Sequence, residues 1–396
     1  MSQEAKKVDT PSSEQPFLAF SKPCISDEAI ADVVTCLKSG WLATGPFVQK
    51  FEEDLRAYLD APYALTLSSA TSGLFFAIEA LNLSPGDEVI TTPLTFVATA
   101  NAIAARGAKP VFVDIDPGTR NLDIKKVEAA ITPKTKAVLP VHFAGLAVDL
   151  DPLYALAKKH NIIVIEDAAH AIGSHYKGKR IGSFGDVQIF SFYANKTMTT
   201  GEGGCLTTRD DAFAEKIRLL RFHGISQTAW DRFSKKGSQH YDVIQVGHKA
   251  NMMDLQGALG VHQLRAVDDF ISKRTAQAEY YYDALSSFDM LNLPTTPTYD
   301  HKHSWHLFTV VLDPTKAGMT RDHLISKLKE HNIGTGLHYN PVHLFPYYQS
   351  TFGYKEGDFP NAEYVGANIL SLPMFPDMTQ EEQNRVITAL TTILKK

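Results

Sequence analysis

Residues 187–204 read VQIFSFYANKTMTTGEGG, an apolar run followed by Lys196 and a glycine-rich turn. The run VQIFS does not alternate polar with apolar residues, which is typical of a strand covered on both faces. Similar runs are YALTL (63–67), EVIT (88–91), PVFVD (110–114), AVLPV (137–141) and IIVIE (162–166). Because longer helical patterns separate them, we predict an α/β fold with a mostly parallel central sheet and helices on both sides.

The sequence also contains residues that are typical of helix ends. Ser26 is a typical N-cap, Asp27 and Glu28 follow it in the first turn, and Gly40 is a typical stop. Helices are also expected over 70–81 and 98–106. After residue 260 the pattern changes to a long helix (265–286), the strand FTVVLD (308–313), a helix (321–331), the run GTGLHY (334–339) and a last helix (380–394). We therefore expect a disordered arm (1–16), a large α/β domain (17–260) and a small C-terminal α+β domain (261–396).

Bulk properties narrow the class of protein. A chain of 396 residues suggests about two domains. Its net charge of −5 disfavours a nucleic-acid binder. The odd set Cys24, Cys36 and Cys205, without a CxxC, suggests neither a disulfide framework nor a zinc ribbon. The polar first 16 residues do not resemble a signal peptide, and no run of about 18 apolar residues predicts a membrane span. We expect a cytoplasmic protein.

Three segments that follow predicted strands carry candidate chemistry, because ligands of open α/β sheets bind at the carboxyl ends of the strands. The hydroxyl-rich SSATSG (68–73) opens a helix and could bind a phosphate, or could be a plain N-cap. Asp167 could pair with a protonated ring nitrogen, or bond only to backbone amides. Lys196 could be a nucleophile toward an aldehyde, or an ordinary loop lysine. Together the three match the needs of pyridoxal phosphate.

The chain resembles the DegT/DnrJ/EryC1/StrS family of sugar aminotransferases from residue 17 to the C-terminus. The stretches that carry this resemblance include GWLATGPFVQKFE, SSATSG, GDEVITTPLTFVATANAI, VIEDAAHAIGSHYKGKRIGSFGD, IFSFYANKTMTTGEGG and GHKANMMDLQGALG. HSWHLF, IGTGLHY and GHKANMMDLQ resemble more narrowly the UDP-4-amino-4-deoxy-L-arabinose–oxoglutarate aminotransferase subgroup. The resemblance implies an aspartate-aminotransferase-like fold (PLP fold type I), a homodimer with shared active sites, and pyridoxal 5′-phosphate as cofactor.

The resemblance also implies roles for individual residues. Lys196, Asp167 and His170 would be catalytic: Lys196 would carry the cofactor as a Schiff base, Asp167 would hold its ring nitrogen protonated, and His170 would lie nearby. The other implied cofactor contacts are Ala70, Thr71 and Ser191 at the phosphate, Phe96 and Ala169 on the two ring faces, and Asn251. Lys249 and His338 would bind substrate, and Lys249 and Asn251 would reach a site at the dimer interface. The sequence departs from the family at two places, since the subgroup often has Trp at position 96 and many relatives have Asn and Arg at positions 249 and 251.

The implied reaction moves an amino group from glutamate, which becomes 2-oxoglutarate, to the C4 keto carbon of a nucleotide-linked sugar. A UDP-4-keto-pentose is the favoured acceptor, and the resemblance suggests lipopolysaccharide biosynthesis or antibiotic-resistance chemistry as the pathway. Alternatives are a dehydratase, which would have His in place of Lys196, a non-catalytic relative that had lost Lys196 or Asp167, and a nicotinamide-dependent epimerase, which would need an N-terminal GxGxxG. The cluster HKHSWH (301–306) could be a metal site, but no acidic or cysteine ligand has a suitable spacing, so no metal is expected. GSHYKGK (173–179) lacks the P-loop Ser or Thr and is expected to be a turn between two short strands.

Overall fold

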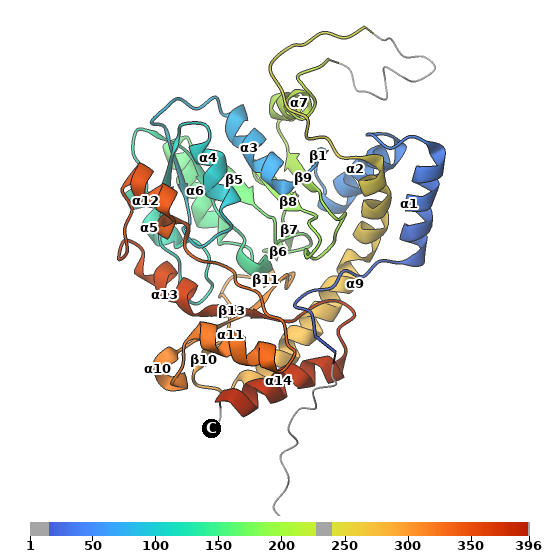
Figure 1. Ribbon diagram of the computed structural model, residues 1–396. Coiled ribbons are helices and arrows are strands. Elements are labelled where there is room, and N and C mark those ends of the chain that lie inside the picture. Colours follow the sequence, from blue (N-terminus) through green and yellow to red (C-terminus); the bar gives the residue numbers. More distant parts are fainter. Residues whose placement is uncertain (1–15, 227–239, 395–396) are drawn as a thin grey trace, which may run out of the picture.

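The computed structural model describes residues 16–226 and 240–394 (Figure 1). Its main sheet has the strand order β1-β9-β8-β5-β4-β2-β3. The strands are β1 (Tyr63–Leu67), β2 (Glu88–Thr91), β3 (Lys109–Phe112), β4 (Thr135–Leu139), β5 (Ile163–Asp167), β8 (Val187–Ser191) and β9 (Gly204–Thr208). Strands β8, β5, β4, β2 and β3 pair in parallel, whereas β9 is antiparallel to both neighbours. The mostly parallel sheet is confirmed, and β9 is an addition to it.

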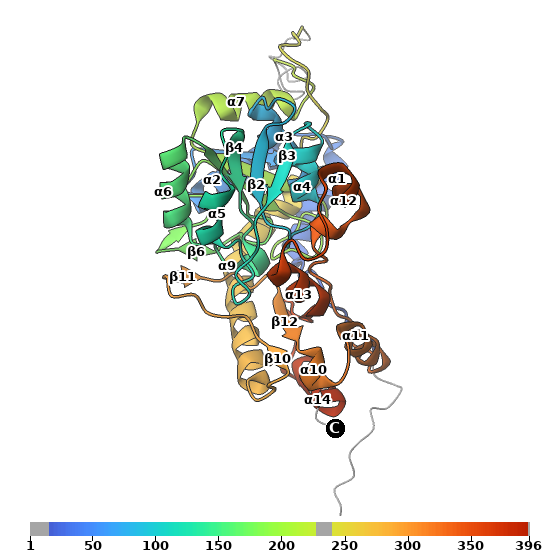
Figure 2. The same cartoon turned by 90° about the vertical axis from the view of Figure 1, so that its left-hand side faces the viewer.

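Helices cover both faces of this sheet (Figure 2). One face packs on α2 (Pro46–Leu59), α5 (Ile124–Ala130), α6 (Leu150–His160) and α9 (Asp254–Leu285), and the other on α3 (Ala70–Ala80), α4 (Ala98–Ala104) and α7 (Asp211–Leu220). Successive strand residues point to opposite faces, so Val164 joins one core cluster and Ile165 the other. Two covered faces are the reason why these strands have continuous apolar sequences.

Helix α1 (Asp27–Ser39) has the predicted ends. The Ser26 hydroxyl accepts a hydrogen bond from the Ala29 amide at 3.2 Å, and Gly40 follows the helix with a φ of 75°. Asp27 and Glu28 lie in the first turn, where their charge is favourable to the helix dipole. Both cap predictions are confirmed.

The long helix α9 starts at Asp254, eleven residues before the expected start at 265, so that boundary was wrong. The reason is close packing against α2, a helix that the sequence analysis did not predict. A Cβ atom at Gly257 would lie 2.7 Å from the Val48 amide nitrogen, and one at Gly260 would lie 2.7 Å from the Phe51 ring. Glycine has a low helix propensity, but here it lets two helices approach each other, and packing outweighs propensity.

The C-terminal part contains a second sheet, β10 (Leu291–Asn292), β12 (Phe308–Leu312) and β13 (Ile369–Leu372). Helices α10 (Pro314–Ala317), α11 (Arg321–Glu330) and α14 (Gln380–Leu394) accompany it, and Figure 1 shows α9 running from the main sheet to this part. The run GTGLHY forms no regular strand; Gly336 makes an isolated bridge to Ser371. The expected domain boundary at 260/261 falls inside α9 and stays a prediction.

The remaining elements connect these layers. They are η1 (Phe143–Gly145), η2 (Val342–Leu344), α12 (Pro346–Phe352), α13 (Pro360–Asn368) and the small sheet of β6 (His175–Tyr176), β7 (Lys179–Arg180) and β11 (His301–Lys302). The turn predicted between two short strands at 173–179 is confirmed by β6 and β7.

The expected arm at 1–16 lies, except for Pro16, outside the described residues. Among residues 16–226 and 240–394, no helix combines the length and the apolarity that crossing a membrane requires. A cytoplasmic location stays a prediction.

Candidate active site

A cavity of about 570 Å³ lies at the carboxyl ends of the parallel strands. Most of the residues singled out from the sequence line it: Ala70, Thr71, Phe96, Asp167, Ala169, His170, Ser191, Lys196 and His338. The main sheet, its loops and the start of α3 contribute all of these except His338, which comes from the segment after α11. The cavity therefore lies where the two parts of the chain meet.

Lys196 lies in the turn after β8, where its amide donates to the Tyr193 carbonyl at 3.0 Å. Burial lowers the pKa of its amine to about 8, although the charge of Asp167 acts in the opposite direction. A larger fraction of this amine is therefore neutral near pH 7 than for an ordinary lysine, as a nucleophile requires. Its placement in the cavity does not fit the alternative of an ordinary loop lysine.

Asp167 ends β5 and is buried at the wall of the cavity. Its Oδ1 accepts from the Ala169 amide at 3.1 Å, and its Oδ2 accepts from the Thr99 hydroxyl at 2.8 Å. Burial raises the pKa of this carboxyl, while these hydrogen bonds and the charge of Lys196 oppose the rise. A backbone amide is thus one partner of Asp167, as expected for an aspartate that bonds to backbone amides. The carboxyl also lines the cavity, where it can accept a hydrogen bond from a further donor.

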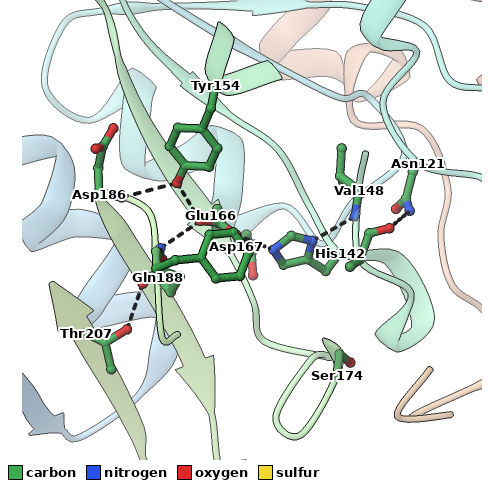
Figure 3. A network of polar contacts seen from close by, with 12 residues as sticks. Asn121, His142, Val148, Tyr154, Glu166, Asp167, Ser174, Asp186, Gln188 and Thr207 are labelled. Carbon is green, nitrogen blue, oxygen red and sulfur yellow. Dashed lines mark hydrogen bonds and ion pairs between the residues drawn. The ribbon is translucent and has the colours of Figure 1, made fainter. Parts of the chain in front are cut away.

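The neighbouring Glu166 points away from the cavity, as alternation along a strand requires. Its Oε2 lies 2.8 Å from His142 Nε2, and its Oε1 accepts from the Tyr154 hydroxyl and the Gln188 amide, both at 2.7 Å (Figure 3). His142 Nδ1 accepts from the Val148 amide at 3.1 Å, so the ring donates to Glu166 through Nε2. This buried network gives every polar group a partner and holds the end of β5 in place.

The start of α3 forms the other end of the cavity. Ser69 caps the helix by accepting from the Ser72 amide at 3.1 Å, and the first backbone bond runs from the Gly73 amide to the Ser69 carbonyl. The amides of Ala70 and Thr71 precede that bond and lie at the positive end of the helix dipole. A Cβ at Gly204 would lie 2.5 Å from the Ala70 nitrogen, so glycine permits this close approach. The segment is both an N-cap and a suitable anion site.

Phe96, His170 and His338 also line the cavity. Phe96 is 57% exposed and lines the cavity, with its ring centroid 6.1 Å from that of Tyr339. His170 is buried: its Nδ1 accepts from the Ala144 amide at 3.2 Å, and its Nε2 lies 3.1 Å from the Tyr339 hydroxyl. His338 Nδ1 lies 2.8 Å from the Ser371 hydroxyl, and burial lowers its pKa to about 4. His170 and His338 therefore act as neutral groups at neutral pH.

Lys249 and Asn251 do not reach this cavity within a single chain. Lys249 Nζ donates to Asn251 Oδ1, and Asn251 Nδ2 donates to the Thr44 hydroxyl at 2.5 Å. Asn251 lines a separate cavity of about 110 Å³. Their expected contribution requires a second subunit and stays a prediction.

Two of the residues that sequence reasoning did not single out make hydrogen bonds to predicted site residues. Tyr339 lines the cavity beside His338, and Thr99 donates to Asp167 from α4. The only sequence signal for Tyr339 was its place in GTGLHY, next to a residue already selected. Thr99 lies in a helix whose pattern indicated packing alone.

Comparison with known proteins agrees with this geometry. The family model of the DegT/DnrJ/EryC1/StrS aminotransferase family matches residues 23–391. The chain belongs to this family. It is 50% identical to the spore coat polysaccharide biosynthesis protein SpsC of Bacillus subtilis over 380 residues. This matched stretch covers 96% of this chain and 97% of SpsC. The family assignment accounts for the order of the candidate anion site, the acid and the lysine along the chain.

Solved structures extend the similarity to the whole fold. Helicobacter pylori PseC, an aminotransferase involved in the biosynthesis of pseudoaminic acid, matches with a TM-score of 0.89 and 30% identity over 96% of this chain and 99% of that chain. The PLP-form of Spr1654 from Streptococcus pneumoniae matches with a TM-score of 0.87, also at 30% identity and over the same shares. This family member is a pyridoxal-phosphate-dependent aminotransferase with the expected fold.

The donor set of the cavity fits pyridoxal phosphate. It combines an amine of lowered pKa, a buried carboxylate and the free amides at the start of α3, which match the aldehyde, the ring nitrogen and the phosphate. Within residues 16–226 and 240–394, no group of three or more His, Cys, Asp or Glu side chains is arranged to hold a metal ion. The cavity thus offers organic-cofactor chemistry at the positions that the sequence suggested.

Proposed function

We propose that this enzyme transfers the amino group of glutamate to the C4 keto carbon of a nucleotide-linked keto-sugar, with a UDP-4-keto-pentose as the first candidate acceptor. The observation that carries the proposal is the convergence of Lys196 and Asp167 on one cavity of about 570 Å³. The names of SpsC and PseC, which refer to a polysaccharide and to pseudoaminic acid, support a sugar acceptor.

Bound pyridoxal phosphate would supply an electron sink for the carbon that loses its proton. Lys196 would bind the cofactor covalently through Nζ and, once displaced by the amino donor, take that proton and return it to the adjoining position. Asp167 would keep a proton on the ring nitrogen, which makes the ring a better acceptor of electrons. The reaction would proceed in two halves, since glutamate leaves as 2-oxoglutarate before the keto-sugar binds.

The remaining residues would bind and orient. The amides of Ala70 and Thr71, with the Ser191 hydroxyl, would hold the phosphate, and Phe96 and Ala169 would restrict the ring from its two faces. His338 would present its free Nε2 to the substrate, because Nδ1 already pairs with Ser371.

We also propose a homodimer in which Lys249 and Asn251 of one subunit reach the cavity of the other. An exposed apolar stripe on α1 supports an interface, since Ile30, Val34 and Leu37 lie on one helix face at 51%, 39% and 52% exposure. Light scattering after size-exclusion chromatography should give the mass of a dimer. A monomer at micromolar concentration would contradict this part of the proposal.

The reaction itself can be tested by visible absorption. Protein loaded with pyridoxal phosphate should have a band near about 420 nm that moves to about 330 nm when glutamate is added, as lysine-based carbonyl chemistry predicts. Keto-sugars are then added one at a time, UDP-4-keto-pentose beside UDP- and dTDP-linked 4-keto-6-deoxyhexoses, and the acceptor restores the first band. If no amino donor moved the band, the proposed reaction would be wrong. If only a hexose restored it, the pentose assignment would be wrong.

A further inference from the structure

The protonation state of His170 follows from its hydrogen bonds. Its Nδ1 faces the Ala144 amide at 3.2 Å, and because an amide only donates, Nδ1 has no proton in the neutral ring. Burial, with a smaller contribution from the charge of Lys196, lowers the pKa of His170 well below its usual value. The ring is therefore neutral near pH 7 and carries its single proton on Nε2.

This tautomer determines the direction of the next hydrogen bond. His170 Nε2 lies 3.1 Å from the Tyr339 hydroxyl oxygen, so the imidazole donates and the phenol oxygen accepts. Burial and the charge of Asp167 raise the pKa of Tyr339, so the phenol keeps its proton. Within the described residues no acceptor is found for that proton, while Tyr339 lines the cavity. A protonated donor without a partner at a cavity wall indicates a ligand acceptor.

The rings around Tyr339 hold its hydroxyl in place. The His170 and Tyr339 rings are nearly parallel, at 19° and 6.1 Å between centroids, and the edge of Phe143 packs against both at 6.5 Å. Phe96 lies 6.1 Å away. A donor fixed in this way needs little reorganisation when a ligand binds.

We propose that Tyr339 donates a hydrogen bond to an oxygen atom bound in the cavity, and that His170 is a positioning residue that acts through Tyr339. The acceptor is an anionic or carbonyl oxygen, either on the ring of pyridoxal phosphate or on the amino donor or keto-sugar. No proton is transferred in this role. The part of the inference that places the acceptor oxygen on a substrate rests on the proposed function.

Tyr339→Phe tests the inference because it removes only the hydroxyl. If the acceptor is on the cofactor, the dissociation constant of pyridoxal phosphate for the apoprotein should rise about tenfold, the size expected for one hydrogen bond to a charged group. If it is on a substrate, cofactor affinity should stay unchanged, and KM should rise or kcat fall about tenfold in one half-reaction. Unchanged cofactor affinity, absorption, KM and kcat would overturn the inference.

Tyr281→Phe is the matched control. Its hydroxyl donates to the Pro373 carbonyl at 2.9 Å in the core of the C-terminal part, outside the cavity. This variant should lose thermal stability without a change in cofactor affinity or KM. If Tyr339→Phe behaved in the same way, its role would be structural and the inference would be overturned.

His170 is tested by two variants. The amide of His170→Gln can still donate toward Tyr339 and should retain part of the effect, whereas His170→Leu should reproduce the loss seen in Tyr339→Phe. The loss in the double variant His170→Leu/Tyr339→Phe should not exceed that in Tyr339→Phe, because groups that act as a unit are not additive. Full additivity would refute the positioning role. If wild-type protein showed no response to glutamate, the proposed function would fail. The dissociation constant of pyridoxal phosphate for Tyr339→Phe apoprotein would still test the role of Tyr339.

Discussion

Thr99 donates a hydrogen bond to Asp167, with 2.8 Å between Thr99 Oγ1 and Asp167 Oδ2. The Thr95 hydroxyl lies 2.8 Å from that of Thr99. Because the single hydroxyl proton of Thr99 is engaged by the carboxylate, Thr95 must be the donor in this second contact. The two threonines thus form a chain of hydroxyls that ends at the proposed partner of the cofactor nitrogen.

Thr99→Val should weaken the interaction of Asp167 with the ring nitrogen of the cofactor. The variant keeps the shape of the side chain and removes one donor, so burial should raise the pKa of Asp167 further and reduce its charge. We expect the dissociation constant of pyridoxal phosphate to rise about 3- to 10-fold, the range of one ordinary hydrogen bond, in a fluorescence titration of the apoprotein. Thr99→Ser keeps the hydroxyl and should resemble wild type. Equal affinity in Thr99→Val would show that the bond does not tune Asp167.

Lys196→Ala should abolish transamination and leave the fold intact. The amine is the covalent attachment point and the proton carrier in the proposed reaction. Within the described residues Asp167 keeps its hydrogen bonds from Thr99 and Ala169 when the amine is removed. Circular dichroism and thermal unfolding check the fold, and 2-oxoglutarate formation checks the activity. Lys273→Ala removes an exposed lysine paired with Asp269 at 2.9 Å and should be fully active. Retained turnover in Lys196→Ala would refute the covalent role.

Cofactor capture should depend on pH through Lys196. Burial lowers the pKa of this amine from 10.5 to about 8, so the neutral, nucleophilic form becomes dominant above about pH 8. The rate at which apoprotein captures pyridoxal phosphate should rise about tenfold per unit below that pH and level off above it, as titration of one group requires. Stopped-flow absorbance between pH 6 and 10 measures this profile. A rate that still rose tenfold between pH 9 and 10 would contradict the lowered pKa.

Gly257→Ala should destabilise the contact between α2 and α9. The added methyl group would lie 2.7 Å from the Val48 amide nitrogen and 2.8 Å from the Phe47 carbonyl carbon, so backbone atoms must shift. We expect the free energy of unfolding to fall by about 1–3 kcal/mol in urea titration, as for overpacked cores. Ser272→Ala lies on an exposed part of α9 and should change it by less than about 0.5 kcal/mol. Unchanged stability in Gly257→Ala would mean that the helices separate without cost.

Much of the main sheet could be predicted because its strands are covered on both faces and their sequences are continuously apolar. Strand β9 was missed, since GCLTT follows a glycine-rich turn and contains two threonines, both buried in the structure. The early start of α9 was missed because Gly257 and Gly260 lower the local helix propensity, and only the neighbouring helix α2 explains them.

The site was predictable where it depends on strand ends. Asp167 ends β5 and Lys196 follows β8, and the carboxyl ends of these neighbouring parallel strands meet at one edge of the sheet. Tyr339 comes from a segment without a regular pattern, which reaches the cavity only through tertiary packing. Lys249 and Asn251 are proposed to act in the cavity of a second subunit, a role that the contacts within one chain do not test.

The continuity of α9 has a geometrical consequence for the cavity. Its N-terminal half packs on the main sheet, and further along the same helix Arg274 donates to the carbonyls of Trp305, His306 and Met374 in the C-terminal part. One residue inserted between these two contacts would rotate the second about 100° around the helix axis and advance it about 1.5 Å. The number of residues between these two contacts therefore fixes how the C-terminal part, which carries His338, is turned relative to the sheet that carries Lys196. An insertion or deletion there would misalign the two walls of the cavity without altering any residue of the site.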